Sequence, residues 1–356
     1  MKKKIVFFMA NLHGGGAERV TTNIIRQLDP DLFDITLLMV KKEGEFLKDI
    51  PSYVKITDLQ VKKTILSIFK LRDFIKQYEP DIVYSTMFHT SIALTLALLG
   101  IKKKPYTVLR NPTSPKLLIT EDNLPFLWRI LLELSYRKAN KILAQTPEMK
   151  EEIIEYHHIN KDKIEVFLNP LDTKNIDQKI KNKNNPFNAA KINVVAAGRL
   201  TEAKAFDTLL YAFQKVVQKD NRFMLHIIGK DDGEEKNLLK LRDELGLSEY
   251  VSFLGFQENP YRFFYFSQLY VLSSRREGLP NTVLENLYLK KPIIATECIP
   301  FMNKLIHDGK NGYIVSVDDI TSLSNAILNY KDLLPISEEV SIAGTLTLFN
   351  DVLEDV

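Results

Sequence analysis

Short apolar runs alternate with amphipathic stretches along almost the whole chain. Seven runs lie in the first half, each bounded by polar or turn-forming residues: 4–10, 34–40, 54–59, 81–86, 105–110, 141–146 and 164–169. Segments between them, such as 17–28 and 65–78, carry apolar residues at helical spacing. Because buried parallel strands read as continuous apolar runs and are joined by crossover helices, the pattern predicts an α/β fold.

This alternation is interrupted once. Residues 173–191 are polar, rich in lysine and asparagine, and weakly patterned, which is typical of a linker. The alternation then restarts with runs at 192–198, 223–229, 250–255, 268–274, 291–297 and 312–317. We therefore expect an N-terminal domain over 1–172, a second domain over 192–335, and a C-terminal helical segment over 336–356, with a return to the N-terminal domain as one option. Doubly wound domains bind ligands at the carboxyl ends of their strands, so the active site is expected in the cleft between them.

Composition and charge narrow the class of protein. The 48 lysines and arginines nearly balance 45 acidic residues, and the net charge of +3 is too small to predict nucleic acid as a partner. The single cysteine, Cys298, excludes an internal disulfide and suits the reducing cytoplasm. The first apolar run is too short for a signal peptide, and residues 91–100 fall far short of the roughly 20 that span a membrane.

Two strand-to-helix loops carry residues suited to a phosphorylated ligand. The sequence "LHGGGAERV" places Gly15 and Gly16 before the first helix, where the backbone can approach an anion. A tight turn without a ligand is the alternative. The sequence "AAGRLTEAKAF" places Arg199 and Lys204 after a strand, and such a pair of cations suits a diphosphate. Solvated surface cations are the alternative here.

A third loop, "SSRREGLPNTVLE", holds two glutamates with seven residues between them. Glu277 is expected at the end of strand 268–274, and Glu285 about one turn inside the following helix. Carboxylates accept hydrogen bonds from sugar diols, and the N–H groups at a helix start can hold a phosphate. The alternative is that Glu277 only complements the helix dipole and Glu285 is a solvated helix residue.

In this order and spacing the motifs strongly resemble those of the retaining family 4 glycosyltransferases, which have the GT-B fold of two Rossmann-like, doubly wound domains facing a central cleft. The resemblance covers nearly the full chain and also includes "NPLD" (169–172), "VSFLGFQENPYRFF" (251–264) and "KLIHDGKNGYIV" (304–315).

This resemblance implies a role for each motif. The donor diphosphate would be bound by Gly15, Gly16, Arg199 and Lys204. Glu277 would hold the donor sugar, Glu285 the ribose hydroxyls, and the backbone near Gly255 and Phe256 the base. The remaining implied donor contacts come from strand ends and the turn before the helix: Gly229, Gly278, Leu279, Pro280, Asn281 and Thr282. No metal or other cofactor is expected, because cations and helix N-termini neutralise the leaving diphosphate.

The chain departs from the family's pattern at several positions. Many members have a histidine after the strand corresponding to 105–110, where this chain has Arg110. Arg110 cannot act as a base but can bind phosphate or acceptor charge, and His89 is the other candidate near the reacting sugar, with a structural role as its alternative. The sequence "CIPFMNKLI" (298–306) replaces a glycine-containing loop that ends in Arg-Glu, and Ala205 stands where glycine is common. Residues 230–232, "KDD", are expected to form a turn and not a metal site.

Two predicted helices in the N-terminal half combine apolar with basic residues. They are 62–77 and 125–141, and the second contains Trp128, the only tryptophan. Ordinary packing of a crossover helix is the alternative for both. Since lipid-linked acceptors are usual in the family, the two helices also suggest peripheral contact with the anionic inner leaflet of the cytoplasmic membrane.

The sequence thus predicts a cytoplasmic, peripheral bacterial enzyme that moves a sugar from a UDP-sugar, with retention, to a lipid-linked saccharide. The sugar would be a hexose or N-acetylhexosamine, and the product a surface polysaccharide or glycan such as O-antigen or capsule. Two alternatives stay open: a catalytically altered protein that binds a sugar nucleotide or glycan, and a UDP-sugar epimerase. Transfer to an acceptor, interconversion of the free donor, or neither would separate them.

Overall fold

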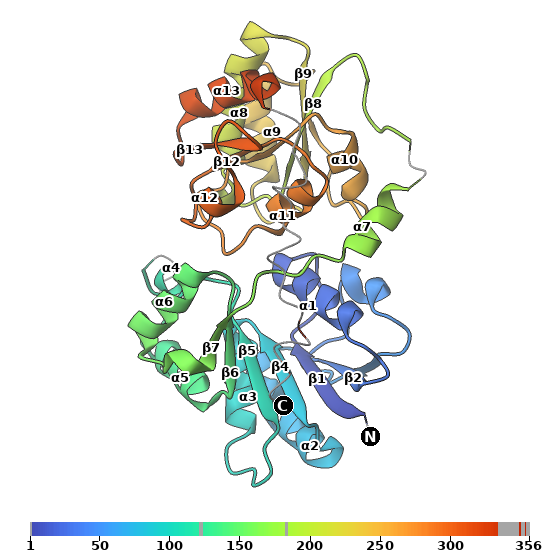
Figure 1. The fold of residues 1–356 in the computed structure, drawn as a ribbon, viewed down its shortest axis with the longest axis vertical. Helices are drawn as coiled ribbons and strands as arrows, with labels where there is room; N and C mark the ends of the chain where they lie inside the picture. The colour runs from blue at the N-terminus through green and yellow to red at the C-terminus, as the bar shows by residue number, and fades with distance from the viewer. Residues whose placement is uncertain (1, 121–123, 182–183, 334–348, 350–352, 354–356) are drawn as a thin grey trace. The chain divides into compact units, whose positions relative to one another are not determined.

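The computed structural model describes residues 2–120, 124–181, 184–333, 349 and 353. The chain folds as two compact units (Figure 1). Unit 1 comprises Met1–Pro170 together with Thr345–Val356, and unit 2 comprises Leu171–Gly344.

Unit 1 is built on a seven-stranded parallel sheet with the order β3-β2-β1-β4-β5-β6-β7. Its strands are β1 (Lys3–Met9), β2 (Phe33–Met39), β3 (Lys55–Asp58), β4 (Ile82–Thr86), β5 (Tyr106–Arg110), β6 (Lys141–Ala144) and β7 (Ile164–Val166). Every apolar run predicted as a strand in this half of the chain overlaps one of them, although β1 and β2 begin one residue before the predicted runs.

Helices cover both faces of this sheet (Figure 1) because consecutive strand residues are apolar and point to opposite sides. Along β1, Ile5 and Phe7 pack in one buried cluster with helix α1, whereas Val6 and Phe8 pack in the other with α2 and α3. The helical elements are α1 (Gly16–Gln27), η1 (Glu45–Asp49), η2 (Thr64–Ser67), α2 (Ile68–Tyr78), α3 (Phe88–Ala97), α4 (Pro115–Thr120), α5 (Phe126–Lys138), α6 (Pro147–His157) and η3 (Lys161–Lys163).

Two described residues of the C-terminal segment belong to unit 1. Phe349 and Leu353 are buried in the same cluster as β1 and α1. The Phe349 ring lies 5.6 Å from the ring of Tyr84 and 5.7 Å from that of Phe167, measured between centroids. At these two residues the chain therefore returns to the N-terminal half. The remainder of the segment predicted as helical over 336–356 lies outside the described residues.

Unit 2 is built on a six-stranded parallel sheet with the order β10-β9-β8-β11-β12-β13. Its strands are β8 (Ile192–Ala197), β9 (Phe223–Ile228), β10 (Val251–Phe253), β11 (Leu269–Leu272), β12 (Ile293–Thr296) and β13 (Gly312–Val315). The buried cluster on one face includes side chains of α8 (Phe206–Lys219), α9 (Glu235–Glu244) and α13 (Ile320–Leu328). The other helical elements are α7 (Thr173–Ile180), η4 (Glu202–Lys204), α10 (Tyr261–Phe266), α11 (Asn281–Tyr288), α12 (Met302–Leu305) and η5 (Tyr330–Asp332).

Part of the segment predicted as a linker folds as α7 within unit 2. The Asp172 side chain caps this helix by accepting from the Asn175 backbone, and Ile176 is buried. The Asn259 amide donates to the Lys179 carbonyl at 2.8 Å, and the Tyr288 hydroxyl donates to Asp177 at 3.0 Å. A short helix that buries one apolar side chain leaves almost no periodic signal, which is why the sequence pattern did not predict it.

Candidate functional site

In unit 2, two predicted site residues from different loops meet at the carboxyl edge of the sheet. Lys204 ends the 3₁₀ helix η4 between β8 and α8, and Glu277 lies in the loop between β11 and α11. Their side chains form an ion pair and are 23% and 12% exposed. The Ser274 hydroxyl donates to the same carboxylate at 2.7 Å. A mostly buried pair held by a further hydrogen bond is much better defined than a surface pair.

Glu285 is the second glutamate of the opening motif and lies inside α11. It is 1% exposed, and the Tyr261 hydroxyl donates to its Oε1 at 3.4 Å. The alternative that Glu285 is a solvated helix residue is therefore wrong. Burial raises the pKa of Tyr270 well above its usual range, and the charges of both Glu277 and Glu285 add to this effect. The two carboxylates thus act on the same hydroxyl from either side of the turn before α11.

The start of α11 carries the predicted turn residues. Pro280 precedes the first helical residue in an extended conformation, and its side chain offers no cap to the helix N-terminus. Leu279 is buried, and Thr282 accepts a hydrogen bond from the Tyr270 hydroxyl at 2.6 Å. Backbone N–H groups at such a terminus attract anions.

Arg199 lies apart from this ion pair. Its guanidinium binds Asp232 at 2.8 Å, and both side chains are exposed, at 61% and 47%. Asp231 accepts from the backbone N–H groups of Gly233 and Glu235, both at 3.0 Å, so the turn predicted at residues 230–232 is confirmed. An exposed pair of this kind contributes little to stability, and a ligand anion can replace the carboxylate.

The backbone favours glycine after β9 and after β10, at Gly229 because of a close approach and at Gly255 because of a positive φ. A Cβ atom at Gly229 would lie 1.7 Å from the Gly198 carbonyl oxygen. The Gly229 N–H donates to the Gly255 carbonyl at 3.0 Å, and Gly255 has a φ of +64°. The half-buried Phe256 follows directly. These positions therefore hold glycine for backbone reasons, whatever they bind.

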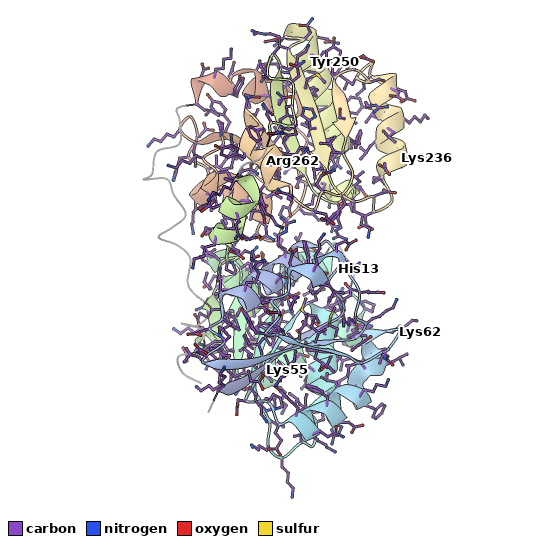
Figure 2. All side chains as sticks on the ribbon, turned by 90° about the vertical axis from the view of Figure 1, so that its right-hand side faces the viewer. His13, Lys55, Lys62, Lys236, Tyr250 and Arg262 are labelled. Carbon is purple, nitrogen blue, oxygen red and sulfur yellow. The ribbon has the colours of Figure 1, made fainter. Side chains whose placement is uncertain are left out.

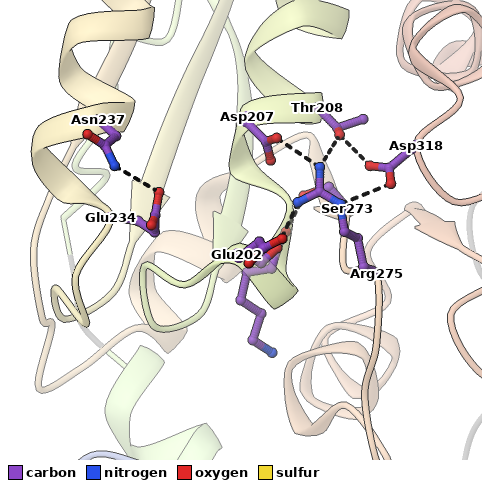
Figure 3. Close-up of polar contacts among 9 residues, drawn as sticks. Glu202, Asp207, Thr208, Glu234, Asn237, Ser273, Arg275 and Asp318 are labelled. Atoms are coloured by element: carbon purple, nitrogen blue, oxygen red, sulfur yellow. Dashed lines mark hydrogen bonds and ion pairs between the residues drawn. The ribbon is translucent and has the colours of Figure 1, made fainter. Parts of the chain in front are cut away.

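One contributor to this edge was not among the predicted site residues. Arg275, two residues before Glu277, makes four side-chain hydrogen bonds, to Glu202, Asp207, Thr208 and Asp318 (Figure 3). Its partners lie 43 to 73 positions away in the sequence. No local pattern could have indicated them.

In unit 1, the glycine-rich loop leads directly into α1. Gly15 is the N-cap with a φ of −93°, so its backbone conformation does not require glycine. A Cβ atom there would lie 2.3 Å from a carboxylate oxygen of Glu18, which folds back over the loop. Thus a carboxylate already occupies the anion-favouring end of α1, and Gly15 leaves room for it.

His13, in the same loop (Figure 2), was also missed by the sequence analysis. Its Nδ1 lies 3.3 Å from Glu45 and its Nε2 lies 3.4 Å from Glu43. Gly44 makes this arrangement possible, because it has a φ of +124° and a Cβ atom there would lie 2.0 Å from the Leu12 carbonyl carbon. Both acidic residues lie about 30 positions downstream, beyond the reach of a local pattern.

Arg110 and His89 are both largely withdrawn from solvent. Arg110 is 1% exposed and donates through Nη2 to the Asn169 amide oxygen at 2.5 Å. Its Nε and Nη1 have no hydrogen-bond partner in the described part of the chain. His89 packs edge-on against Phe88 with ring centroids 5.4 Å apart, and burial lowers its pKa. His89 is therefore neutral near pH 7.

Two family models match the chain. The model described as Glycosyltransferase Family 4 matches residues 14–175, and the model described as Glycosyl transferases group 1 matches residues 177–339. Together they account for the two sheets and the loops described above. The chain is a GT-B glycosyltransferase.

Named relatives agree with this assignment. The glycosyltransferase is 31% identical over 255 residues to an uncharacterized glycosyltransferase of Methanocaldococcus jannaschii. The matched residues make up 66% of this chain and 60% of that relative. It is 26% identical over 340 residues to the N-acetylgalactosamine-N,N'-diacetylbacillosaminyl-diphospho-undecaprenol 4-alpha-N-acetylgalactosaminyltransferase of Campylobacter jejuni, covering 90% of this chain and 88% of that relative.

The predicted GT-B fold is confirmed by solved structures. Anabaena Alr3699/HepE in complex with UDP and glucose superimposes with a TM-score of 0.79 at 17% identity, covering 99% of this chain and all of that one. The lipopolysaccharide-biosynthesis glycosyltransferase WaaG superimposes with a TM-score of 0.71 at 11% identity, covering 95% and 92% of the two chains. At these identities the likeness concerns the fold.

The loop after β12, for which the sequence resemblance implies a departure from the family's glycine-containing loop, adjoins the Lys204–Glu277 ion pair. Burial raises the pKa of the Cys298 thiol to about 12, and the charge of Glu277 adds to the effect. The residues that follow are anchored by apolar side chains, since Phe301 and Met302 are buried as α12 begins. An apolar, helical turn therefore stands where a glycine loop is usual.

Proposed function

We propose that this glycosyltransferase moves a hexose or N-acetylhexosamine from a UDP-sugar to a lipid-linked saccharide, with retention at the anomeric carbon, in bacterial surface polysaccharide or glycan assembly. The observation that carries the proposal is the Lys204–Glu277 ion pair beside buried Glu285 at the carboxyl edge of one parallel sheet. That edge is where doubly wound sheets bind nucleotides.

Roles for the donor follow from the chemistry of each side chain. Lys204 and Arg199 would neutralise the diphosphate, together with N–H groups of Gly15, Gly16 and the turn 278–282. Glu277 would accept hydrogen bonds from the sugar hydroxyls and Glu285 from the ribose diol. Gly229, Gly255 and Phe256 would present backbone to the base. The solved complex of HepE with UDP and glucose supports a uridine nucleotide as the donor.

Retention would be achieved without a protein nucleophile. Glu277 is ion-paired with Lys204, which suits it to holding hydroxyls and not to attacking carbon. The bond between the anomeric carbon and the diphosphate oxygen breaks, and the acceptor hydroxyl oxygen bonds to the same face of that carbon. The acceptor proton passes to the released phosphate oxygen. Lys204 then stabilises the negative charge that grows on the diphosphate, with no metal or other cofactor in the proposed reaction.

The acceptor proposal rests on relatives and on the surface of unit 1. The Campylobacter jejuni relative is named for an acceptor on diphospho-undecaprenol. Large apolar side chains are exposed on three elements that pack against α3, namely η2, α2 and α5. They are Leu66, Phe69, Phe126 and Leu127, which are 60 to 78% exposed. Lys62 and Lys63 directly precede the first of these elements (Figure 2). Apolar side chains next to cations suit an anionic leaflet, so we propose peripheral contact with the inner face of the cytoplasmic membrane.

Among the residues that the structure describes, no helix is both long and apolar enough to cross a membrane.

In this proposal Arg110 binds the phosphate charge of the acceptor, and His89 lies near the reacting sugar. In the conformation described, Arg110 is buried, so contact with a phosphate requires the side chains around it to move.

A panel of nucleotide sugars tests the proposal. The purified protein is screened for binding by thermal shift and then incubated with lipid-diphosphate saccharides, with product analysis by mass spectrometry. We expect Lys204→Ala and Glu285→Ala each to lower kcat/KM for transfer by about 100-fold, corresponding to about 3 kcal/mol. Lys219→Ala, an exposed lysine at the end of α8, is the matched control.

The outcomes separate the three functions. Unchanged transfer in both site variants would overturn the proposal. Interconversion of the free donor without an acceptor would show an epimerase, and donor binding with neither reaction would show a binding protein.

A further inference from the structure

Three consecutive backbone carbonyls of η4 are held by the neighbouring loop. The Glu202 carbonyl accepts from Arg275 Nη1 at 2.8 Å, and the Ala203 carbonyl accepts from the Arg275 backbone N–H at 2.8 Å. The Lys204 carbonyl accepts from the Ser273 hydroxyl at 2.9 Å. The whole peptide segment that carries Lys204 is therefore positioned by two residues from the end of β11.

The Arg275 guanidinium also binds the start of α8 and the loop after β13. Its Nη2 donates to Asp207 at 2.8 Å and to Thr208 at 3.2 Å, and its Nε donates to Asp318 at 2.9 Å. The Thr208 hydroxyl in turn donates to Asp318 at 2.6 Å. Figure 3 shows these contacts joining the loops after β8, β11 and β13.

In this cluster one cation, Arg275, is bound by two carboxylates, those of Asp207 and Asp318. Hydrogen bonds from Arg275 hold the pKa of Asp318 below its usual value, and those to Asp207 and Asp318 raise the pKa of Arg275. Arg275 and Asp318 are consequently both ionised near neutral pH. Only a guanidinium offers enough donors in a planar fork to bind a carbonyl and two carboxylates at once.

The backbone of this segment needs such support. Ala205, directly after Lys204, has a φ of +48° and a ψ of 43°, a left-handed conformation that alanine rarely adopts. Ala205 is fully buried, so solvent cannot relieve the strain. Arg275 contacts Glu202 and Ala203 before this strained position and Asp207 and Thr208 just after it, while Ser273 holds the Lys204 carbonyl.

We propose that Arg275 is a positioning residue that fixes the backbone of η4 and so aims the Lys204 ammonium at the leaving diphosphate. This inference rests on the proposed function. A misplaced ammonium stabilises the growing charge poorly, and small displacements of a catalytic group are costly in rate. Arg275 touches neither donor nor acceptor in this scheme and acts only through Lys204.

A double-mutant cycle tests the inference. Arg275→Lys keeps the charge but loses the fork, which favours a folded protein. Transfer kcat/KM and the Kd for UDP are measured for wild type, Arg275→Lys, Lys204→Ala and the double variant, with melting temperatures for all four. Arg222→Lys is the matched control, since Arg222 binds Asp220 with three hydrogen bonds just before β9, at the opposite edge of the sheet.

If Arg275 acts through Lys204, the effect of Arg275→Lys on kcat/KM depends on whether Lys204 is present. We expect Arg275→Lys to lower kcat/KM by about 10-fold or more, chiefly through kcat, in the presence of Lys204, and by less than about threefold once Lys204 is alanine. The fall in melting temperature, in contrast, should be the same in both backgrounds. Arg222→Lys should leave kcat/KM within about twofold of wild type.

The possible failures are distinguishable. An equal fall in both backgrounds, or no fall in either, would overturn the role of Arg275 while Lys204→Ala still impairs transfer. If Lys204→Ala itself leaves both transfer and UDP affinity unchanged, the proposed function fails, and the role of Arg275 fails with it.

Discussion

Charged side chains are paired differently at the carboxyl edges of the two sheets. In unit 2, cations and carboxylates from different loops are matched, as in Lys204 with Glu277 and Arg275 with Asp318. In unit 1, Arg110 is 1% exposed and donates to the neutral amide of Asn169, with no carboxylate among its hydrogen-bond partners in the described residues. Burial consequently lowers the pKa of Arg110.

This difference indicates how each edge is prepared for a ligand. Charges paired across loops offset part of each other's desolvation cost and fix the loops before a ligand arrives. A desolvated cation without a countercharge raises the free energy of the fold, and an anion of the ligand would offset that cost. The edge in unit 2 is preorganised, whereas the edge in unit 1 holds an unbalanced charge.

The largest losses of stability are expected at a feature that both edges share, a close backbone contact that only glycine permits. In Gly229→Ala the new methyl meets the Gly198 carbonyl, and in Gly44→Ala it meets the Leu12 backbone. We expect each to lower the free energy of unfolding by about 3 kcal/mol or more, measured by urea denaturation. Gly309→Ala, with a φ of +73° and no atom within 4 Å, is the control and should lose about 1 kcal/mol. If either variant lost no more unfolding free energy than Gly309→Ala, the two edges would not share this requirement for glycine.

The contrast itself is tested by replacing each arginine with methionine. Arg275→Met leaves Asp207 and Asp318 without their partner and should lower the free energy of unfolding by about 2 kcal/mol. Arg110→Met removes a buried charge at the cost of one hydrogen bond, so the change should stay within about 1 kcal/mol. Denaturation in urea measures both. A larger loss in Arg110→Met than in Arg275→Met would break the contrast.

Acid should destabilise both units, because each contains a histidine whose pKa is lowered to about 4 in the folded protein. Burial lowers the pKa of His157 in unit 1 to about 4, and that of His226 in unit 2 to about 4. The unfolded chain binds these protons at higher pH than the folded one, so stability is lost as pH falls from about 6.5 to 4, by about 2 kcal/mol for each histidine.

Denaturation midpoints across that pH range measure the effect. His157→Gln and His226→Gln should each flatten the acid limb of the profile, whereas His158→Asn, at an exposed position next to His157, should retain the wild-type slope. A wild-type slope in either buried variant would show that its histidine is protonated in the folded protein.

The smallest effect concerns the loop that departs from the family's pattern. Burial and the charge of Glu277 raise the pKa of Cys298 to about 12. Because the thiolate is the reactive form, Cys298 should react slowly with iodoacetamide at pH 8. Glu277→Gln should speed alkylation several-fold, because less negative charge opposes the thiolate. Exposed Glu249 provides the control variant, and Cys298 is the only cysteine, so its rate is measured directly. An unchanged rate would place Glu277 too far away to act.

Local patterns were sufficient for the strands but not for every other element. Each predicted apolar run overlaps one strand, because burial on both faces demands consecutive apolar residues. Helix α7 was missed because it is only eight residues long and carries two apolar residues, Ile176 and Ile180, within a polar segment. The burial of Glu285 could not be predicted either, because a glutamate in a helix is usually solvated and only packing with Tyr261 and its neighbours decides otherwise.

By itself, the sequence determined two parallel sheets and placed Lys204, Glu277 and Arg110 at strand ends, because hydrophobic runs and turn residues act over a few positions. Only the tertiary structure decided which of these charges meet. Lys204 and Glu277 are 73 positions apart, and Arg275 reaches partners in two other loops. Such contacts depend on how strands are ordered in the sheet, and no local pattern encodes that order.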